Sequence, residues 1–254
     1  MLLPFAPFAF LPWDVTRFAW VAIDAAVAVW AIRRLRLPAY WLAFPPLFEA
    51  IVLGHPEVLV LGILVGVSGP LAGLAALVKP YAVLPLLAER RFLAIVIAGV
   101  ATGATLLILP WGQFLAELST ISANLARQNV GDSTFGDPAL MVIGGIALIA
   151  LGPRRALWLA VPVLWPYAQP IYKVMSIPVL PPVLALAWAI PIPGMTLMGV
   201  VVLAVLTVVN RQRTLPGWLV NGIRPASTNF EAPAALATGL GTNTVGAALR
   251  TELA

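Results

Sequence analysis

Cysteine is absent from this chain of 254 residues, histidine occurs once, as His55, and only 10% of the residues are charged. Without cysteine the chain has no disulfide framework, no thiolate metal site and no cysteine nucleophile. A single histidine also excludes a metal site built from several imidazoles. No phosphate-binding glycine loop, zincin helix or nucleophile elbow is present either, so the common soluble-enzyme motifs give no function.

The scarcity of charge leaves a strongly apolar chain, which is 61% hydrophobic with a mean hydropathy of +0.97. A soluble domain of this length needs far more polar surface to cover its core. Where lipid is the outer solvent, helices can instead be apolar on all sides. We therefore predict an all-α fold, a polytopic transmembrane helical bundle.

The charges that remain are sorted along the chain. The net charge of +5 is carried in short loops, without the basic stripe and interleaved aromatics of a nucleic-acid-binding surface. Arginine-rich gaps at residues 33–36, 90–91 and 154–155 alternate with gaps at 55–57 and 117–137 that carry mostly acids and amides. Under the positive-inside rule this alternation predicts a multi-pass plasma-membrane protein with its arginines in the cytosol.

Residues 1–209 divide into about eight spans or part-spans, counted at the usual span length. Val58–Val78 looks like the cleanest span, and its Gly62, Gly66 and Gly69 predict close helix contact. Lys79 is then expected at the cytoplasmic end of that span, more as a snorkelling anchor than as a ligand. The chain contains 24 prolines, many inside apolar runs, which predict kinked and re-entrant helices.

Three further segments complete the expected organisation. Gln113–Leu125 has the periodicity of a helix lying on the outer membrane surface. Strict alternation puts Arg211 and Arg213 outside unless Ala156–Trp165 is re-entrant, and the sequence leaves both possibilities open. Residues 210–254 are rich in Ala, Gly, Thr, Asn and Pro, and we predict a disordered tail there.

Ionisable residues inside or near the apolar runs are the first candidates for a site, because charge near lipid is costly. Asp24 lies within an apolar run. It is either a functional acid or a structural one that faces the bundle interior and bonds to a neighbouring helix. Glu49, His55 and Glu57 form an acid–imidazole group expected at the outer face and are candidate substrate-binding residues. Solvated loop residues that cap helices are the alternative interpretation.

Arg127 and Lys173 are cations on the predicted outer side, against the positive-inside trend. A cation there suggests an anionic partner such as a lipid phosphate, so both are candidate substrate-binding residues. Pairing with Asp132 or Asp137, or with a phospholipid headgroup, is the alternative. Asp14 is a weak candidate for a catalytic base, with a helix cap near Val15 as the equal alternative.

The order of elements resembles a known family of membrane enzymes. A helix ending in arginines is followed by Gly54-His55, where the related proteins usually have Gly-Gln, and by a glycine-rich run that ends in Leu77-Val78-Lys79-Pro80. A polar outer loop follows, and then Trp165-Pro166-Tyr167 leads to Tyr172-Lys173. This order resembles the GT-C class of membrane glycosyltransferases, in particular glycosyltransferase family 87 (DUF2029), over roughly residues 1–209.

The resemblance implies a GT-C-type bundle that transfers a hexose, mannose above all, from a polyprenyl-phosphate sugar to an extracytoplasmic glycolipid or polysaccharide. It implies no cofactor, because the lipid-linked sugar is a substrate, and it adds Tyr172 to the substrate-binding candidates. In that class the catalytic aspartate lies in the first outer loop, and no residue here matches it. We therefore expect the first span and catalytic loop to be missing, and the catalytic residue stays unknown.

Two other functions remain open at this point. Broken helices with polar groups near the midplane would suit a transporter or flippase, although the sequence shows no inverted repeat. A truncated, non-catalytic fragment of such a transferase that assembles with a partner is the other possibility. An assay of sugar transfer by the chain distinguishes the enzyme from both the transporter and the non-catalytic fragment.

Overall fold

The structure is a computed structural model that describes residues 10–107, 109–128, 132–166, 168–192 and 194–211. All regular elements within these ranges are helical, as predicted, and they contain no strand. The boundary expected at residue 209 falls two residues before the end of the last described helix, Met195–Arg211 (α11). The predicted C-terminal tail lies almost wholly outside the described residues.

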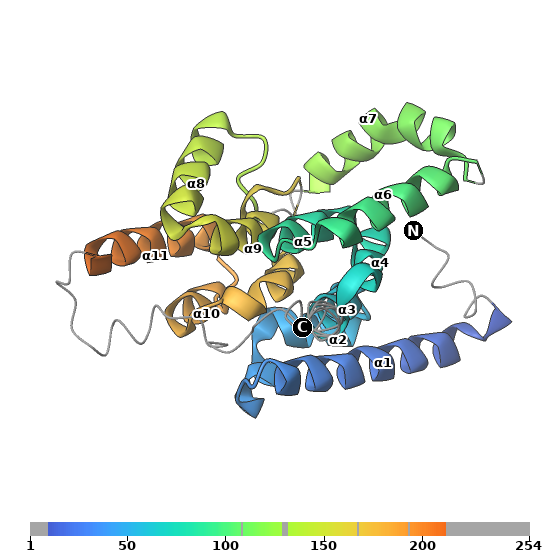
Figure 1. Ribbon diagram of the computed structural model, residues 1–254, viewed down its shortest axis with the longest axis horizontal. Coiled ribbons are helices and arrows are strands. Elements are labelled where there is room, and N and C mark those ends of the chain that lie inside the picture. Colours follow the sequence, from blue (N-terminus) through green and yellow to red (C-terminus); the bar gives the residue numbers. More distant parts are fainter. Residues whose placement is uncertain (1–9, 108, 129–131, 167, 193, 212–254) are drawn as a thin grey trace, which may run out of the picture.

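The longest helix is α1, Trp13–Arg34, which runs along the lower edge of Figure 1. Its 22 residues span about 33 Å, enough to cross the hydrocarbon core of a bilayer. Two arginines, Arg33 and Arg34, occupy its last turn, where cations favour the helix C-terminus. Asp14 lies in its first turn, so it does not cap a helix that begins near Val15, and Pro12 precedes the helix without a side-chain cap.

By length and composition, α1 is the one described helix that could cross a membrane alone. A second candidate exists if α2, Pro45–Leu53, and α3, Glu57–Gly66, are taken together, although the two are bent by 113°. The short helix η2, Ala39–Ala43, precedes them. The structure therefore supports one or two candidate spans, where the hydropathy pattern predicted about eight, because the chain breaks its apolar runs into short pieces.

The turn between α2 and α3 depends on Gly54, whose φ of 65° is left-handed and ends α2. The indole Nε1 of Trp20, on α1, donates a hydrogen bond of 2.6 Å to the carbonyl oxygen of Gly54. An added Cβ at Gly54 would lie 2.6 Å from the Trp20 ring. Glycine is thus required here both for backbone conformation and for space, and the turn is fixed against α1.

The run Val58–Val78 is not one span, and that prediction is wrong. Helix α3 ends at Gly66, Val67 and Ser68 are extended, and the chain then forms η3, Gly69–Gly73, and α4, Leu74–Val78. Gly69 has a left-handed φ of 65° and precedes Pro70, which disfavours helix at the residue before it. The run therefore forms a broken hairpin, and its second arm returns toward the start of α3.

Contacts of two glycines hold the first arm of this hairpin on α1. A Cβ at Gly62 would collide with Val27, and one at Gly66 would collide with the ring of Trp30. The predicted close contact is confirmed at Gly62 and Gly66, whereas Gly69 faces open space at the break. At the tip, Nη1 of Arg91 donates a 2.8 Å hydrogen bond to the carbonyl oxygen of Val67.

The chain continues through η4, Pro80–Ala82, and α5, Val83–Ala88, to α6, Phe92–Thr105. Helix α7, Trp111–Gln128, follows and confirms the helix predicted from the periodicity of 113–125. At the end of α5, the Glu89 carboxylate binds Nε of Arg154 at 2.9 Å and accepts a 3.0 Å hydrogen bond from Nε1 of Trp158. Two of the arginine groups predicted to share one side therefore lie next to each other.

A second broken hairpin follows α8, Pro138–Leu151, which Asp137 caps by accepting from the amides of Ala139 and Leu140. Its arms are α9, Pro153–Leu164, and η5, Pro170–Val179, which lie against each other. Ser176 Oγ donates a 3.2 Å hydrogen bond to the carbonyl oxygen of Trp158 across the two arms. Helix α10, Pro182–Trp188, leads to α11, which packs beside α8 at the left of Figure 1.

Candidate functional site

The carboxylate of Glu57, at the start of α3, is fully buried and gathers three polar side chains. Lys79 Nζ lies 3.0 Å from Glu57 Oε1, and the hydroxyl of Tyr81 donates to the same oxygen at 3.1 Å. His55 Nδ1 lies 3.3 Å from Glu57 Oε2. We call these four residues the Glu57 cluster, which the broken hairpin creates by returning Lys79 and Tyr81 to the N-terminus of α3.

Aromatic rings from the second hairpin form one side of this cluster. The ring of Tyr81 lies 5.1 Å from that of Tyr172 and 5.7 Å from that of Trp165, measured between centroids. Lys79 Nζ lies 5.5 Å from the centroid of the Tyr172 ring, in cation–π range.

Asp24, near the middle of α1, is fully buried beside this cluster and close enough to Glu57 for their charges to interact. Neither of its carboxyl oxygens has a hydrogen-bond partner among the described residues. The expected bond to a neighbouring helix is therefore not seen, although the residue does face the interior. Such a buried acid is costly, which makes it a candidate functional group in its own right.

The two basic residues of the Glu57 cluster are partly exposed, whereas its carboxylate is not. The side chain of Glu57 is 0% exposed, whereas those of Lys79 and His55 are 24% and 32% exposed. A ligand that approaches would meet the ammonium and the imidazole first, with the carboxylate behind them to orient both. This arrangement suits a ligand with an anionic group or several hydroxyls, since the ammonium donates hydrogen bonds to an anionic group and both basic side chains can bond to hydroxyls.

A second polar cluster is closed. Lys173, which is 2% exposed, forms a 2.7 Å ion pair with Asp132, and Asp132 also accepts a hydrogen bond from Thr196 Oγ1. Lys173 Nζ lies 6.0 Å from the centroid of the Trp188 ring. The ion pair joins η5 to the loop before α8. Lys173 is therefore paired with Asp132, as the structural alternative in the sequence analysis stated. Its neighbour Tyr172 faces the Glu57 cluster instead.

Sequence comparison adds the decisive observation, because the profile of glycosyltransferase family 87 matches residues 1–222. The chain belongs to glycosyltransferase family 87. Neither the curated proteins nor the solved structures include a significant match to it. Family membership confirms the resemblance found in the sequence and implies glycosyl transfer between a sugar donor and an acceptor.

The predicted site residues of this glycosyltransferase are only partly brought together. His55 and Glu57 meet in the Glu57 cluster, and the ring of Tyr172 packs against Tyr81 of that cluster. Glu49 is exposed on α2, and Asp14 is exposed at the start of α1, about 15 Å along that helix from Asp24. Arg127 belongs to α7, but its side chain lies outside the described part of the structure.

Two members of the site, Lys79 and Tyr81, were not predicted from sequence. Both belong to the Lys79-Pro80-Tyr81 segment at the end of the run that carried the family resemblance. The sequence contained a signal for these residues, but a single span over Val58–Val78 places Lys79 on the side of the membrane opposite Glu57. Ser68-Gly69-Pro70 is the sequence feature that contradicts a continuous span. Among the described residues no group of three or more acidic or imidazole side chains is arranged to hold a metal ion.

Proposed function

We propose that this family 87 member transfers a hexose, mannose above all, from a polyprenyl-phosphate sugar to a glycolipid or polysaccharide acceptor. The Glu57 cluster is the site we assign to this reaction, and one observation carries the assignment. A fully buried carboxylate pairs with a lysine that is 24% exposed and an imidazole that is 32% exposed, within a chain that belongs to a glycosyltransferase family.

Lys79 is the residue we assign to the donor phosphate. In the reaction an acceptor oxygen forms a bond to the anomeric carbon while the bond from that carbon to the phosphate oxygen breaks. Negative charge grows on the departing polyprenyl phosphate, and a nearby ammonium stabilises it. Lys79 is accessible, whereas Lys173 is buried in its pair with Asp132 and serves better to fix η5. Arg127 remains a second candidate ligand.

The acceptor hydroxyl has to lose its proton during this displacement, and a carboxylate within hydrogen-bond reach is the usual base. Glu57 can take this role once Lys79 turns toward the phosphate, because Oε1 then loses its ion pair and keeps only the hydrogen bond from Tyr81. Asp14 is retained as a weaker candidate base, because it is exposed and lies far along α1 from the cluster. Tyr172 and His55 complete the cluster as sugar-contacting groups.

The location that fits this function is the plasma membrane, with a multi-pass GT-C-type bundle and the active face extracytoplasmic. Support comes from α1 as a candidate span and from the proximity of the loops 89–91 and 154–155. Helix α3 places Glu57 about 15 Å from the hairpin tip at Val67, where Arg91 binds, and this is roughly half the hydrocarbon thickness. A lipid-linked donor can reach this depth from the outer leaflet.

The test is sugar transfer by the full chain in proteoliposomes, supplied with radiolabelled polyprenyl-phosphate mannose and a glycolipid acceptor. We expect Lys79→Met to lower transfer by about 100-fold or more, the scale of losing one charge-stabilising group. Glu117→Gln, an exposed acid on α7, is the matched control and should keep wild-type transfer. Wild-type transfer by Lys79→Met would remove the cluster from the reaction, and flux of donor without transfer would favour a flippase.

A further inference from the structure

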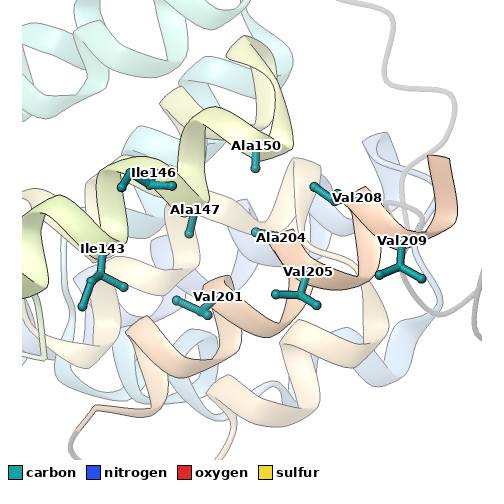
Figure 2. Close-up of a pocket in the computed structure, with 9 residues that line it drawn as sticks. All are labelled: Ile143, Ile146, Ala147, Ala150, Val201, Ala204, Val205, Val208 and Val209. Carbon is teal, nitrogen blue, oxygen red and sulfur yellow. The ribbon is translucent and has the colours of Figure 1, made fainter. Parts of the chain in front are cut away.

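A groove of about 410 Å³ lies between α8 and α11, far from the Glu57 cluster in sequence. Figure 2 shows its nine lining side chains, four from α8 and five from α11, and all of them are aliphatic. They recur at helical spacing on each helix, as in Ile143, Ile146 and Ala150, and again in Val201, Val205 and Val208.

The depth of the groove comes from small residues between larger ones. Ala147 and Ala204 form its floor and are nearly buried, whereas Ile146 and Val205 rise on either side and are more than half exposed. The lining offers no polar atom to a ligand, so it selects for hydrocarbon alone. An open, aliphatic groove between two helices fits a hydrocarbon chain.

One end of this groove is strongly basic. The lining residue Ala150 is the last but one of α8, and Arg154 and Arg155 follow at the start of α9. The ion pair between Arg154 and Glu89 also brings the neighbouring residue Arg90 toward this end, whereas Arg91 binds the carbonyl oxygen of Val67. Four arginines and one glutamate give the segments 89–91 and 154–155 a net charge of +3.

We propose that the groove binds an anionic phospholipid of the surrounding bilayer, with one acyl chain between α8 and α11 and the phosphate at Arg155 and Arg154. Charge complementarity carries the choice of occupant, because an apolar channel ending in excess positive charge matches a hydrocarbon chain ending in a phosphate. The donor polyprenyl phosphate fits less well, since its phosphate belongs at the Glu57 cluster and not at the arginine loops.

The experiment is native mass spectrometry of the full chain, purified from nanodiscs that contain equal amounts of phosphatidylglycerol and phosphatidylcholine. We expect bound phosphatidylglycerol on the wild type and its loss in Val205→Trp, which fills the groove. Val202→Trp is the matched control, because Val202 is an exposed valine of α11 outside the lining. Val205→Ser adds polarity without bulk and should also weaken phosphatidylglycerol binding, so it replaces the tryptophan variant if that variant does not fold.

The headgroup is tested separately. Arg155→Gln should lose the preference for phosphatidylglycerol over phosphatidylcholine, and Arg17→Gln, an exposed arginine on α1, should keep it. Equal retention of the two lipids, or equal loss in Val205→Trp and Val202→Trp, would overturn the proposal. So would displacement of the lipid by polyprenyl phosphate, or a dimer that only Val205→Trp disrupts, because these identify another occupant.

Discussion

The ammonium of Lys79 lies 3.0 Å from the carboxylate of Glu57, although a run of apolar residues long enough to cross a bilayer separates them in sequence. This contact is possible only because the run turns back at Ser68-Gly69-Pro70. It places Lys79 on a buried acid, and it unites residues that hydropathy assigns to opposite membrane faces. The proposed active site depends on this single reversal.

The Lys79–Glu57 pair should be asymmetric in its effect on stability. Lys79→Met leaves the fully buried Glu57 carboxylate without its cation, which costs about 3 kcal/mol in the unfolding free energy. Glu57→Gln should cost less, because the exposed part of Lys79 can reach water. The double variant should recover much of the Lys79→Met loss in unfolding experiments in detergent micelles. Additive losses would show that the two side chains are not coupled.

Gly66→Ala should destabilise the chain, because the new Cβ collides with the ring of Trp30, so either the ring loses its packing or the two helices shift. We expect a loss of about 1–3 kcal/mol, as for other overpacked interfaces. Gly103→Ala on α6 meets open space and should be neutral or stabilising by up to about 1 kcal/mol. Thermal unfolding of both variants tests the contrast, and adding Trp30→Ala to Gly66→Ala should relieve the clash.

Asp24→Asn should leave the unfolding free energy within about 1 kcal/mol of the wild-type value. Neither carboxyl oxygen has a described hydrogen-bond partner, so the amide gives up no visible bond. Asp137→Ala is the comparison, since that acid caps α8 and its loss should cost about 1 kcal/mol. A much larger loss in Asp24→Asn would mean that the acid holds a cation or a proton that folding requires.

Lys173→Ala should lose sugar transfer through the fold, and not through lost contact with the donor phosphate. Removing the lysine leaves Asp132 and Thr196 facing a hole in a closed cluster. Replacing the ion pair by Lys173→Met with Asp132→Leu should restore folding, because apolar residues of similar size often substitute for buried pairs. Transfer by the folded double variant would confirm a structural role, and its absence would return Lys173 to the reaction.

Much of the architecture is readable from the chain because it follows from local chemistry. Apolar runs with arginine ends predict helices such as α1, and the periodicity of 113–125 predicts α7. The acid–imidazole pair of Glu57 and His55 was identified because adjacent polar residues in an apolar sequence are conspicuous. Lys79 was misassigned because hydropathy measures the length of an apolar run and not its direction, and one glycine–proline step reverses the direction.

Composition alone determined that this chain is helical and lipid-compatible, since scarce charge and abundant apolar residues leave backbone groups no partners except their own helix. The order of its motifs determined the glycosyltransferase family. Tertiary structure decided which polar residues meet, because Glu57, Lys79 and Tyr172 come from three segments that only two broken hairpins bring together. It also decided that Lys173 pairs with Asp132, since a lysine this deeply buried requires a counter-ion that no local pattern specifies.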